Sequence, residues 1–334
     1  MNMTQWTEAV IADKNRIFAP IMYYPCTSLV GVKAVDTVKA GGAQAMAAVM
    51  KAAADRFPEM AIVSTALDVT VDPEAFGVAV DYDEDRAPHC VSFVIKDEAD
   101  AEAMTMPSAM TERQVLHYEA VKEAKKLMPE KPVFGNLLGP FTLATSVMKL
   151  SDAMLGVMKK GPMMHVVIEK CTEFVINRAL AYKAAGADGI LLDEACGGII
   201  PPKKCAEFSS AYIKKIVEAV QDDQFAVMMH NCGNIARMLD SIFDTGCRMY
   251  SFGNAVDFKL AAEKLPEGAL LIGNLDPMLL TEEDDNKVYE ETKALIEAMA
   301  DCPGFVPAPG CDVPTNARLE SVDAMIRAIK EANS

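Results

Sequence analysis

Several features are scarce in this chain, and each absence removes a class of protein. No apolar run reaches the roughly 18 residues of a membrane helix, so we expect no membrane span. Residues 1–18 have the polar spacing of a surface helix and lack the basic-then-apolar order of a signal peptide. These absences predict a cytoplasmic protein.

Basic side chains are also in short supply. The chain has 32 Lys and Arg residues against 48 Asp and Glu residues, and its formal net charge is −16. Nucleic-acid binding needs a basic footprint for the phosphates, so we expect no nucleic-acid partner. The same balance argues more weakly against a substrate with many carboxylates, because a local basic pocket can exist on an acidic protein.

Disulfide frameworks and tight CxxC pairs are missing as well. The nine cysteines are an odd number at scattered positions, which favours reduced thiols. We expect most of them to be small buried residues, and the 22 methionines to fill gaps in the core.

No linker rich in Pro, Gly or Ser divides the 334 residues, so we predict one domain over 1–334. Amphipathic stretches such as 43–57 and 283–302 separate short apolar runs. Alternating strands and helices imply a parallel sheet, and eight such units predict an α/β fold of the (β/α)8 TIM-barrel type behind an N-terminal helix. The eight predicted strands are 19–24, 61–65, 132–138, 189–194, 225–232, 249–252, 269–275 and 305–311.

Residues 66–130 are more than one crossover needs, so we predict an insertion after the second strand. In a barrel it would lie over the mouth formed by the carboxyl ends of the strands, where active sites are found. Polar and small residues collect at these predicted strand ends: Asp68, Asn136, Gly139, Asp193, His230, Cys232, Asn274, Asp276 and Cys311.

The motifs HNCGN (230–234) and PGCDVP (309–314) contain the most informative of these residues. His230 and Cys232 are two apart on one strand and therefore point to the same side. With Cys311 they supply three N/S ligands, the pattern of a catalytic zinc that keeps an open position. Two thiolates suit activation of a substrate thiol better than hydrolysis. The alternative is that the three residues pack separately and never meet.

The other strand-end residues have two interpretations each. Asp193 could be a catalytic pocket residue. Asp193 or Glu194 could supply a fourth zinc ligand or a hydrogen bond that orients a zinc ligand. The alternative is that one of them caps the next helix along the chain. Asp68 could face the mouth or cap a local turn. We further predict that Asn136, Gly139, Asn274 and Asp276 line a cofactor or substrate pocket, with helix capping equally open for Asp276.

Five motifs in order carry a resemblance to a known family. They are GPFTLA (139–144), DEACGGIIPP (193–202), HNCGN, GNLDP (273–277) and PGCDVP. Over about 19–330 the chain resembles the uroporphyrinogen decarboxylase superfamily, and within it the corrinoid-linked methyltransferases, including methylcobalamin:coenzyme M methyltransferases. The resemblance implies a TIM barrel, and it implies that His230, Cys232 and Cys311 hold Zn²⁺.

The resemblance also implies the reaction and its partners. A methyl group would move between a small substrate, either a thiol acceptor or a methylated donor such as a methyl ether, and the cobalt of a separate corrinoid protein. Methylcobalamin or cob(I)alamin would come with that partner, because the chain lacks the D-x-H-x-x-G pattern of cobalamin domains. The direction, the fourth zinc ligand and formation of a homodimer are left open.

Two alternatives remain. One is uroporphyrinogen decarboxylase: the chain keeps Asp68 nine residues before Gly77, as the decarboxylase does at its catalytic aspartate, but the decarboxylase's arginine-rich segment is replaced here by MYYPCTSLVG (22–31). Without that arginine clamp, a polycarboxylate substrate would have no bidentate partner. The second alternative is a non-catalytic barrel with a structural zinc.

Overall fold

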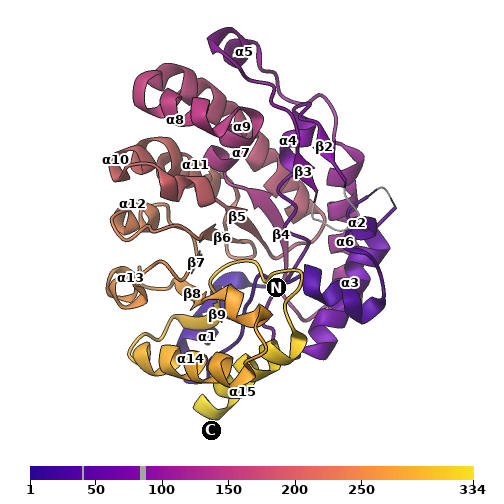
Figure 1. Cartoon of the computed structure of the whole chain (residues 1–334), viewed down its shortest axis with the longest axis vertical. Helices are drawn as coiled ribbons and strands as arrows, with labels where there is room; N and C mark the ends of the chain where they lie inside the picture. The colour runs from indigo at the N-terminus through magenta and orange to yellow at the C-terminus, as the bar shows by residue number, and fades with distance from the viewer. Residues whose placement is uncertain (40, 83–87) are drawn as a thin grey trace.

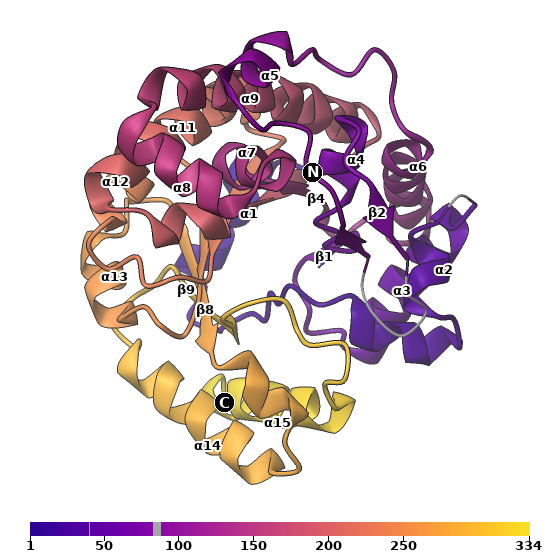
Figure 2. The same ribbon diagram turned by 45° about the horizontal axis from the view of Figure 1, so that its top comes forward.

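The computed structural model describes residues 1–39, 41–82 and 88–334 (Figure 1). Seven parallel strands form one sheet in the order β1-β4-β5-β6-β7-β8-β9, and β2 and β3 form an antiparallel pair. The sheet curls so that helices surround it (Figure 2). The strands are β1 Val63–Ser64, β2 Val80–Asp81, β3 His89–Cys90, β4 Val133–Leu138, β5 Gly189–Asp193, β6 Ala226–Asn231, β7 Met249–Phe252, β8 Leu270–Leu275 and β9 Phe305–Pro309.

Most helices lie between consecutive strands, as the predicted crossovers require. Every residue of β4, β5 and β6 is buried, which is the pattern of a parallel sheet covered on both faces. The helices are α1 Met3–Ala12, η1 Tyr24–Val30, α2 Ala34–Thr37, α3 Ala43–Arg56, α4 Val71–Ala75, α5 Glu98–Ala103, α6 Glu112–Leu127, α7 Pro140–Val147, α8 Leu150–Lys159, α9 Gly161–Ala184, η2 Ala195–Ile199, α10 Pro202–Cys205, η3 Ala206–Ser210, α11 Ala211–Val220, α12 Leu239–Phe243, α13 Phe258–Lys264, η4 Pro277–Thr281, α14 Asp285–Ala298 and α15 Leu319–Ala332. None of those in the described part is long and apolar enough to cross a bilayer.

The predicted first strand, 19–24, is not a strand of the sheet. Phe18 makes a single parallel bridge to Met60, and the carbonyl of Ile21 accepts a hydrogen bond from Val313 N at 2.9 Å. Pro20 and Pro25 have no N–H to donate to a ladder, and Pro25 instead occupies the first turn of η1. In the described residues the parallel sheet therefore has seven strands rather than eight.

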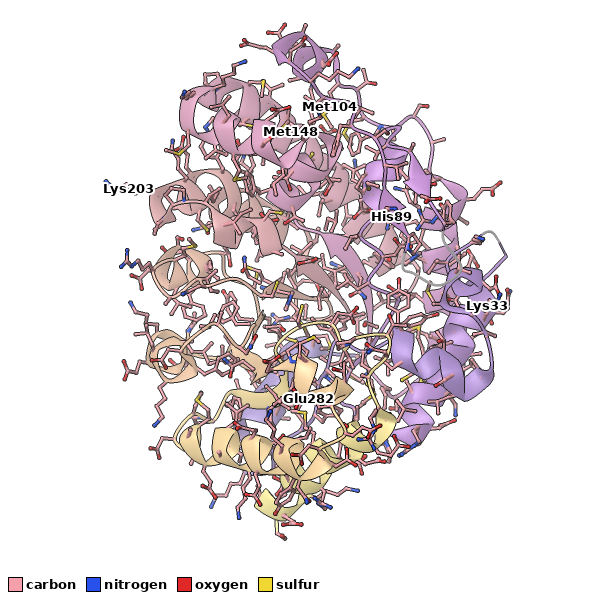
Figure 3. All side chains as sticks on the ribbon, viewed as in Figure 1. Lys33, His89, Met104, Met148, Lys203 and Glu282 are labelled. Carbon is pink, nitrogen blue, oxygen red and sulfur yellow. The ribbon has the colours of Figure 1, made fainter. Side chains whose placement is uncertain are left out.

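The stretch between β1 and β4 holds more than a crossover helix. It contains α4, the β2–β3 hairpin and α5 before α6, and the hairpin lies beside α4 and α6 (Figure 2). His89 on this hairpin is exposed (Figure 3), and its Nε2 lies 3.8 Å from Asp81 Oδ2. That the segment covers the mouth stays a prediction.

Two layers of side chains fill the inside of the curled sheet. A lower layer is a separate apolar cluster that includes Phe134, Leu191, Met228, Met249 and Ile272, with Met3 of α1 packed into it. Because side chains alternate along a strand, the next inward position on each strand lies two residues further on. Those positions are polar: Asn136, Asp193, His230, Ser251 and Asn274. The sheet thus presents a polar layer at its carboxyl end, above an apolar floor.

His117 on α6 is a buried histidine outside this layer. Burial, with help from Arg178 and Arg113, lowers its pKa well below the usual value. Its Nδ1 lies 3.3 Å from the Tyr182 hydroxyl, and its Nε2 has no partner. The folded protein therefore keeps this ring neutral at pH values where the unfolded chain protonates it.

We predict that His117 contributes to acid sensitivity. Its depressed folded pKa means that stability is full above the unfolded pKa of about 6.5 and falls as the pH drops below it, by up to about 1.4 kcal/mol per pH unit. His117→Gln should remove this slope when urea unfolding is measured between pH 7.5 and pH 5.5. The control is His165→Gln, because that ring is 42% exposed. An unchanged slope in His117→Gln would contradict the assignment.

Candidate metal centre

His230, Cys232 and Cys311 meet at the carboxyl end of the sheet. His230 lies on β6, Cys232 follows that strand directly, and Cys311 follows β9. Their ligand atoms all lie within 4.8 Å of one another. Zinc binds sulfur at about 2.3 Å and nitrogen at about 2.0 Å, so its ligands stand roughly 3.5–4 Å apart. The three atoms are therefore close enough to bind one ion with little movement.

The His230 ring is oriented as a metal ligand requires. Its Nδ1 lies 3.1 Å from the Ser251 hydroxyl on the neighbouring strand β7. Its Nε2 is buried and has no hydrogen-bond partner. A ligating histidine typically bonds an outer group through one nitrogen and the metal through the other. A buried nitrogen without a partner is costly, and a metal ion would satisfy it.

The two sulfurs differ in environment. Cys232 is exposed and Cys311 is half-buried, so the cluster opens to solvent on one side. The contact between the two thiols, followed by the nearby His230, lowers the pKa of Cys232, and the same contact raises the pKa of Cys311, so Cys232 is the sulfur that is held as a thiolate. Thiolate is the form that binds metals, so the arrangement favours a ligand over an inert thiol.

Two glycines allow the loops after β6, β7 and β9 to approach one another. A Cβ on Gly253, which follows β7, would lie 2.7 Å from the Cys232 carbonyl oxygen. A Cβ on Gly310 would lie 2.8 Å from Asn254 N and 3.0 Å from Gly253 Cα. The loops after β6, β7 and β9 therefore touch backbone to backbone, which brings Cys311 to the other two ligands.

We predict that Gly253→Ala weakens metal binding without unfolding the chain. The added methyl group must push the backbone of Cys232 outward, and a displaced ligand should lower the zinc affinity by about tenfold or more. Affinity can be measured by competition with a chromophoric chelator. The matched control is Gly161→Ala, whose Cβ would meet nothing nearer than 3.6 Å. Equal affinities in the two variants would show that the close approach does not position Cys232.

The adjacent acids Asp193 and Glu194 face different surroundings. Asp193 ends β5 opposite His230 in the parallel register, and its Oδ1 accepts a hydrogen bond from Ala195 N at 3.2 Å. Burial raises the pKa of Asp193, while His230 opposes that rise. Asp193 therefore lies beside the cluster. It is not one of the three residues that could hold an ion together.

Glu194 points away from the cluster. Its carboxylate accepts hydrogen bonds from Phe141 N at 3.1 Å, Thr142 N at 3.0 Å and the Ser209 hydroxyl at 2.7 Å. It thus caps the first turn of α7 from another element, where a carboxylate is favoured. Burial raises its pKa to about 7. Helix capping therefore describes its contacts, but the capped helix is α7, which precedes Glu194, and not the next helix along the chain that the sequence suggested.

Gly139 and Asn136 lie near the Glu194 carboxylate that caps α7, and they have different roles. A Cβ on Gly139 would overlap Glu194 Oε2, so this glycine makes room for the capping carboxylate. Asn136 belongs to the polar layer. Its amide Nδ2 donates to the carbonyl of Thr65, which directly follows the neighbouring strand β1, and its Oδ1 is buried without a partner. Only Asn136 of this pair offers an atom to a ligand.

Asn274 and Asp276 support the loops. Asn274 Nδ2 donates to the carbonyls of Gly253 at 3.2 Å and Val256 at 2.8 Å, which fastens the loop after β7 to β8. Asp276 accepts a hydrogen bond from Met278 N at 2.9 Å and so caps η4. Their contacts are those of positioning and capping residues.

Asp68 is held by an arginine that sequence reasoning missed. Its carboxylate accepts hydrogen bonds from Arg113, from Thr70 N at 3.0 Å and from the Thr70 hydroxyl at 2.7 Å. The Asp68 side chain is fully buried, and Arg113 also pairs with Glu74 at 3.0 Å. Nothing near Asp68 in the sequence indicates this pairing, because Arg113 arrives from α6.

Other residues of the centre were also not singled out from the sequence. Ser251, Gly253 and Gly310 act through His230 or through backbone approach. Asp312 is next to Cys311 in the PGCDVP motif, and its Oδ1 is buried without a partner. Its position next to Cys311 could have identified Asp312 from the sequence. The partners of Ser251 and Gly253 can be identified only from the structure.

A parallel α/β sheet curled around an apolar floor, with a histidine and two cysteines at its carboxyl end, defines a barrel-type protein with a candidate zinc centre. The family model for uroporphyrinogen decarboxylase (URO-D) matches residues 39–332. The chain belongs to this family.

Known proteins similar to the chain include both methyltransferases and decarboxylases. The methylcobamide:CoM methyltransferase MtbA of Methanosarcina acetivorans is 28% identical over 80% of this chain and 79% of its own length. The uroporphyrinogen decarboxylase of Psychromonas ingrahamii is 24% identical over 79% and 77%. A solved methyltransferase structure from Methanosarcina mazei superposes with a TM-score of 0.84 at 23% identity, covering 99% of this chain and 98% of that one. At this identity the structural similarity shows a shared fold and nothing more.

Proposed function

We propose that this chain is a zinc-dependent methyltransferase that moves a methyl group between a small thiol and the cobalt of a separate corrinoid protein. The convergence of His230, Cys232 and Cys311, with the Nε2 of His230 left free, carries the proposal. The methylcobamide:CoM methyltransferases among the relatives support it.

Each residue of the metal centre would have a separate role in the reaction. When bound, zinc would keep a substrate thiol ionised at neutral pH, so that its sulfur stays a nucleophile. His230, Cys232 and Cys311 would hold the ion, Ser251 would fix the His230 ring, and the exposed side at Cys232 would admit the partner. The methyl group would leave its bond to cobalt and form an S–C bond, its bonding electrons staying on cobalt and the thiol proton passing to solvent.

We also propose the finer architecture. Residues 18–23 would take the place of the first strand of an eight-unit barrel, since Phe18 bridges Met60 and Ile21 bonds Val313 at the two open edges. The segment between β1 and β4 would border the mouth. The whole chain would act as one domain in the cytoplasm, with a second copy as partner in a homodimer.

Uroporphyrinogen decarboxylase is the second candidate, because decarboxylases stand among the relatives. The contacts of Asp68 weigh against it. That carboxylate, the counterpart of the catalytic aspartate in the resemblance, is buried and paired with Arg113. A polycarboxylate substrate would also meet MYYPCTSLVG where the decarboxylase has arginines.

Metal analysis and two activity assays separate the candidates. We expect about one zinc per chain, and transfer of methyl from methylcobalamin to a small thiol, followed by the visible spectrum of the cobalamin. Turnover of uroporphyrinogen III by metal-free protein would instead establish the decarboxylase. Zinc without either activity would leave a structural metal site, and absence of zinc would remove the proposal.

A further inference from the structure

A small cavity lies in the helix layer outside the sheet, between α6 and α9. Its volume is about 230 Å³. Residues 106–110, in the segment that leads from α5 to α6, border it (Figure 2). The other lining residues are Gln114 and Tyr118 of α6, and Phe174, Asn177 and Arg178 of α9. The lining includes no residue of the metal centre, so the cavity is a site of its own.

The side chain of Gln114 has a donor without a partner. Gln114 is only 2% exposed. Its Oε1 accepts a hydrogen bond from Thr111 N at 2.8 Å, as part of the capping box that begins α6. That bond fixes the orientation of the amide and leaves Nε2 buried with no partner. A buried N–H group without an acceptor is costly, and an oxygen atom of a bound molecule would satisfy it.

Arg178 brings a second donor to the same cavity. Its Nε donates to Asp72 at 3.0 Å, and its Nη1 donates to the Tyr118 hydroxyl at 2.5 Å. The third nitrogen, Nη2, has no hydrogen bond to any described residue, yet it is not among the fully buried unpaired atoms. Nη2 therefore reaches open space, and Arg178 lines the cavity. Tyr118 is an acceptor in its bond to Arg178, so its hydroxyl hydrogen is left for another partner.

The charges around the cavity favour an anion. None of the lining residues is acidic, and Arg178 is the one lining residue with a charge. The Asp72 carboxylate that balances Arg178 does not line the cavity, because its two oxygens accept from Arg178 Nε and from Leu138 N. The donors that line the cavity therefore meet no carboxylate of the protein there.

The walls and the size of the cavity favour an apolar body. Met106, Pro107 and Phe174 contribute apolar surface to the lining. Binding pockets typically combine such walls with a few polar groups that fix the orientation of the ligand. A cavity of roughly 150 Å³ with apolar walls holds a benzene molecule. The larger cavity between α6 and α9 has room for a ring and a carboxylate.

We propose that this cavity binds a small monocarboxylate with a compact apolar body, such as an aromatic acid. The carboxylate accepts hydrogen bonds from Gln114 Nε2 and Arg178 Nη2, and the apolar body lies against Phe174. A carboxylate offers only acceptors, which matches a lining that presents donors, and its bond to the guanidinium is charge-assisted. The ligand links α6 to α9. The site is independent of the proposed methyl transfer.

Three small molecules separate the contributions of charge and of apolar surface. Benzoate has both, benzyl alcohol has the ring without the charge, and inorganic phosphate has charge without the ring. Each is titrated into the protein in an isothermal calorimeter. We expect the Kd of benzoate to be at least about tenfold lower than that of either other compound, the size of one charge-assisted hydrogen bond. Equal affinity for benzoate and benzyl alcohol, or no binding of benzoate, would overturn the proposal.

Gln114→Glu assigns the binding to this cavity. The substitution keeps the length of the side chain and an oxygen for Thr111 N, since glutamate also serves in a capping box, but it removes the donor and adds a negative charge. The Kd of benzoate should rise at least about tenfold. Arg178 is left unchanged, because its loss would leave a buried carboxylate unpaired.

Gln224→Glu is the matched control, since it adds the same charge at an exposed position between α11 and β6. This variant should keep the Kd of the parent protein. Urea unfolding of both variants shows whether the fold is intact. An unchanged Kd in Gln114→Glu would mean that the acid binds elsewhere, for example at the metal centre, and would refute the assignment to this cavity.

Discussion

Cys311→Ala should reduce bound zinc from about one ion per chain to nearly none and lower methyl transfer by at least about a hundredfold. Cys311 is the ligand supplied from β9, so its loss leaves only the pair from β6. Two ligands separated by one residue cannot enclose an ion in a tetrahedral shell. Zinc is measured by atomic emission on protein purified without chelators, and activity by the cobalamin spectrum.

Cys302→Ala is a matched control for this experiment. Cys302 is also a half-buried cysteine next to β9, but it precedes the strand and so lies at the other end of the sheet. The Cys302→Ala variant should therefore keep both its zinc and its activity. Far-UV circular dichroism of Cys311→Ala then distinguishes two roles for the metal. A folded variant without zinc fits a catalytic ion, and an unfolded one would mean that zinc holds the structure together.

Much of the strand arrangement could be predicted from the sequence, for a simple physical reason. A strand in a parallel sheet is buried on both faces, so it reads as a short apolar run, and seven of the eight predicted runs contain a sheet strand. The polar layer was predictable too, because a strand that ends at a site changes from apolar to polar at its last inward positions. Asn136, Asp193 and His230 were found in this way.

The prediction of a strand at 19–24 was wrong because an apolar composition does not show which backbone groups form hydrogen bonds. Residues 19–24 are buried like a strand, but Pro20 and Pro25 interrupt the ladder of donors. In place of a ladder there are one bridge, from Phe18 to Met60, and one further hydrogen bond, from Val313 N to the Ile21 carbonyl. Both prolines can be read from the sequence. Had they counted for more than the apolar side chains, no regular strand would have been predicted there.

The roles of acidic residues were harder to predict, because they depend on partners distant in the chain. Glu194 caps α7, which begins more than fifty residues earlier, and Gly139 is small because that carboxylate occupies its side-chain space. Asp68 is neutralised by Arg113 from α6. A sequence indicates that a carboxyl group follows a strand, but it does not indicate which distant N–H groups the folded chain brings to it.

Arg178→Met should destabilise the protein by about 3–5 kcal/mol, because it leaves a buried carboxylate without its counter-charge. Arg178 on α9 and Asp72 on α4 are each only 3% exposed, and Arg178 Nε lies 3.0 Å from Asp72 Oδ1. The second oxygen of Asp72 accepts a hydrogen bond from Leu138 N at 3.0 Å, at the end of β4. The pair thus anchors the start of the segment between β1 and β4 to the sheet.

A double-mutant cycle measures whether the unpaired charge causes the loss. In Arg178→Met/Asp72→Asn the amide oxygen can still accept from Leu138 N, but no charge is left unpaired, so the double variant should be more stable than Arg178→Met alone. Free energies of unfolding come from urea titrations at pH 7.5. Arg56→Met is the control, since its pair with Asp323 is exposed and should contribute less than about 1 kcal/mol. If Arg178→Met cost no more than Arg56→Met, the buried pair would not be what fastens α4 to β4, and the Leu138 hydrogen bond and apolar packing would carry that attachment.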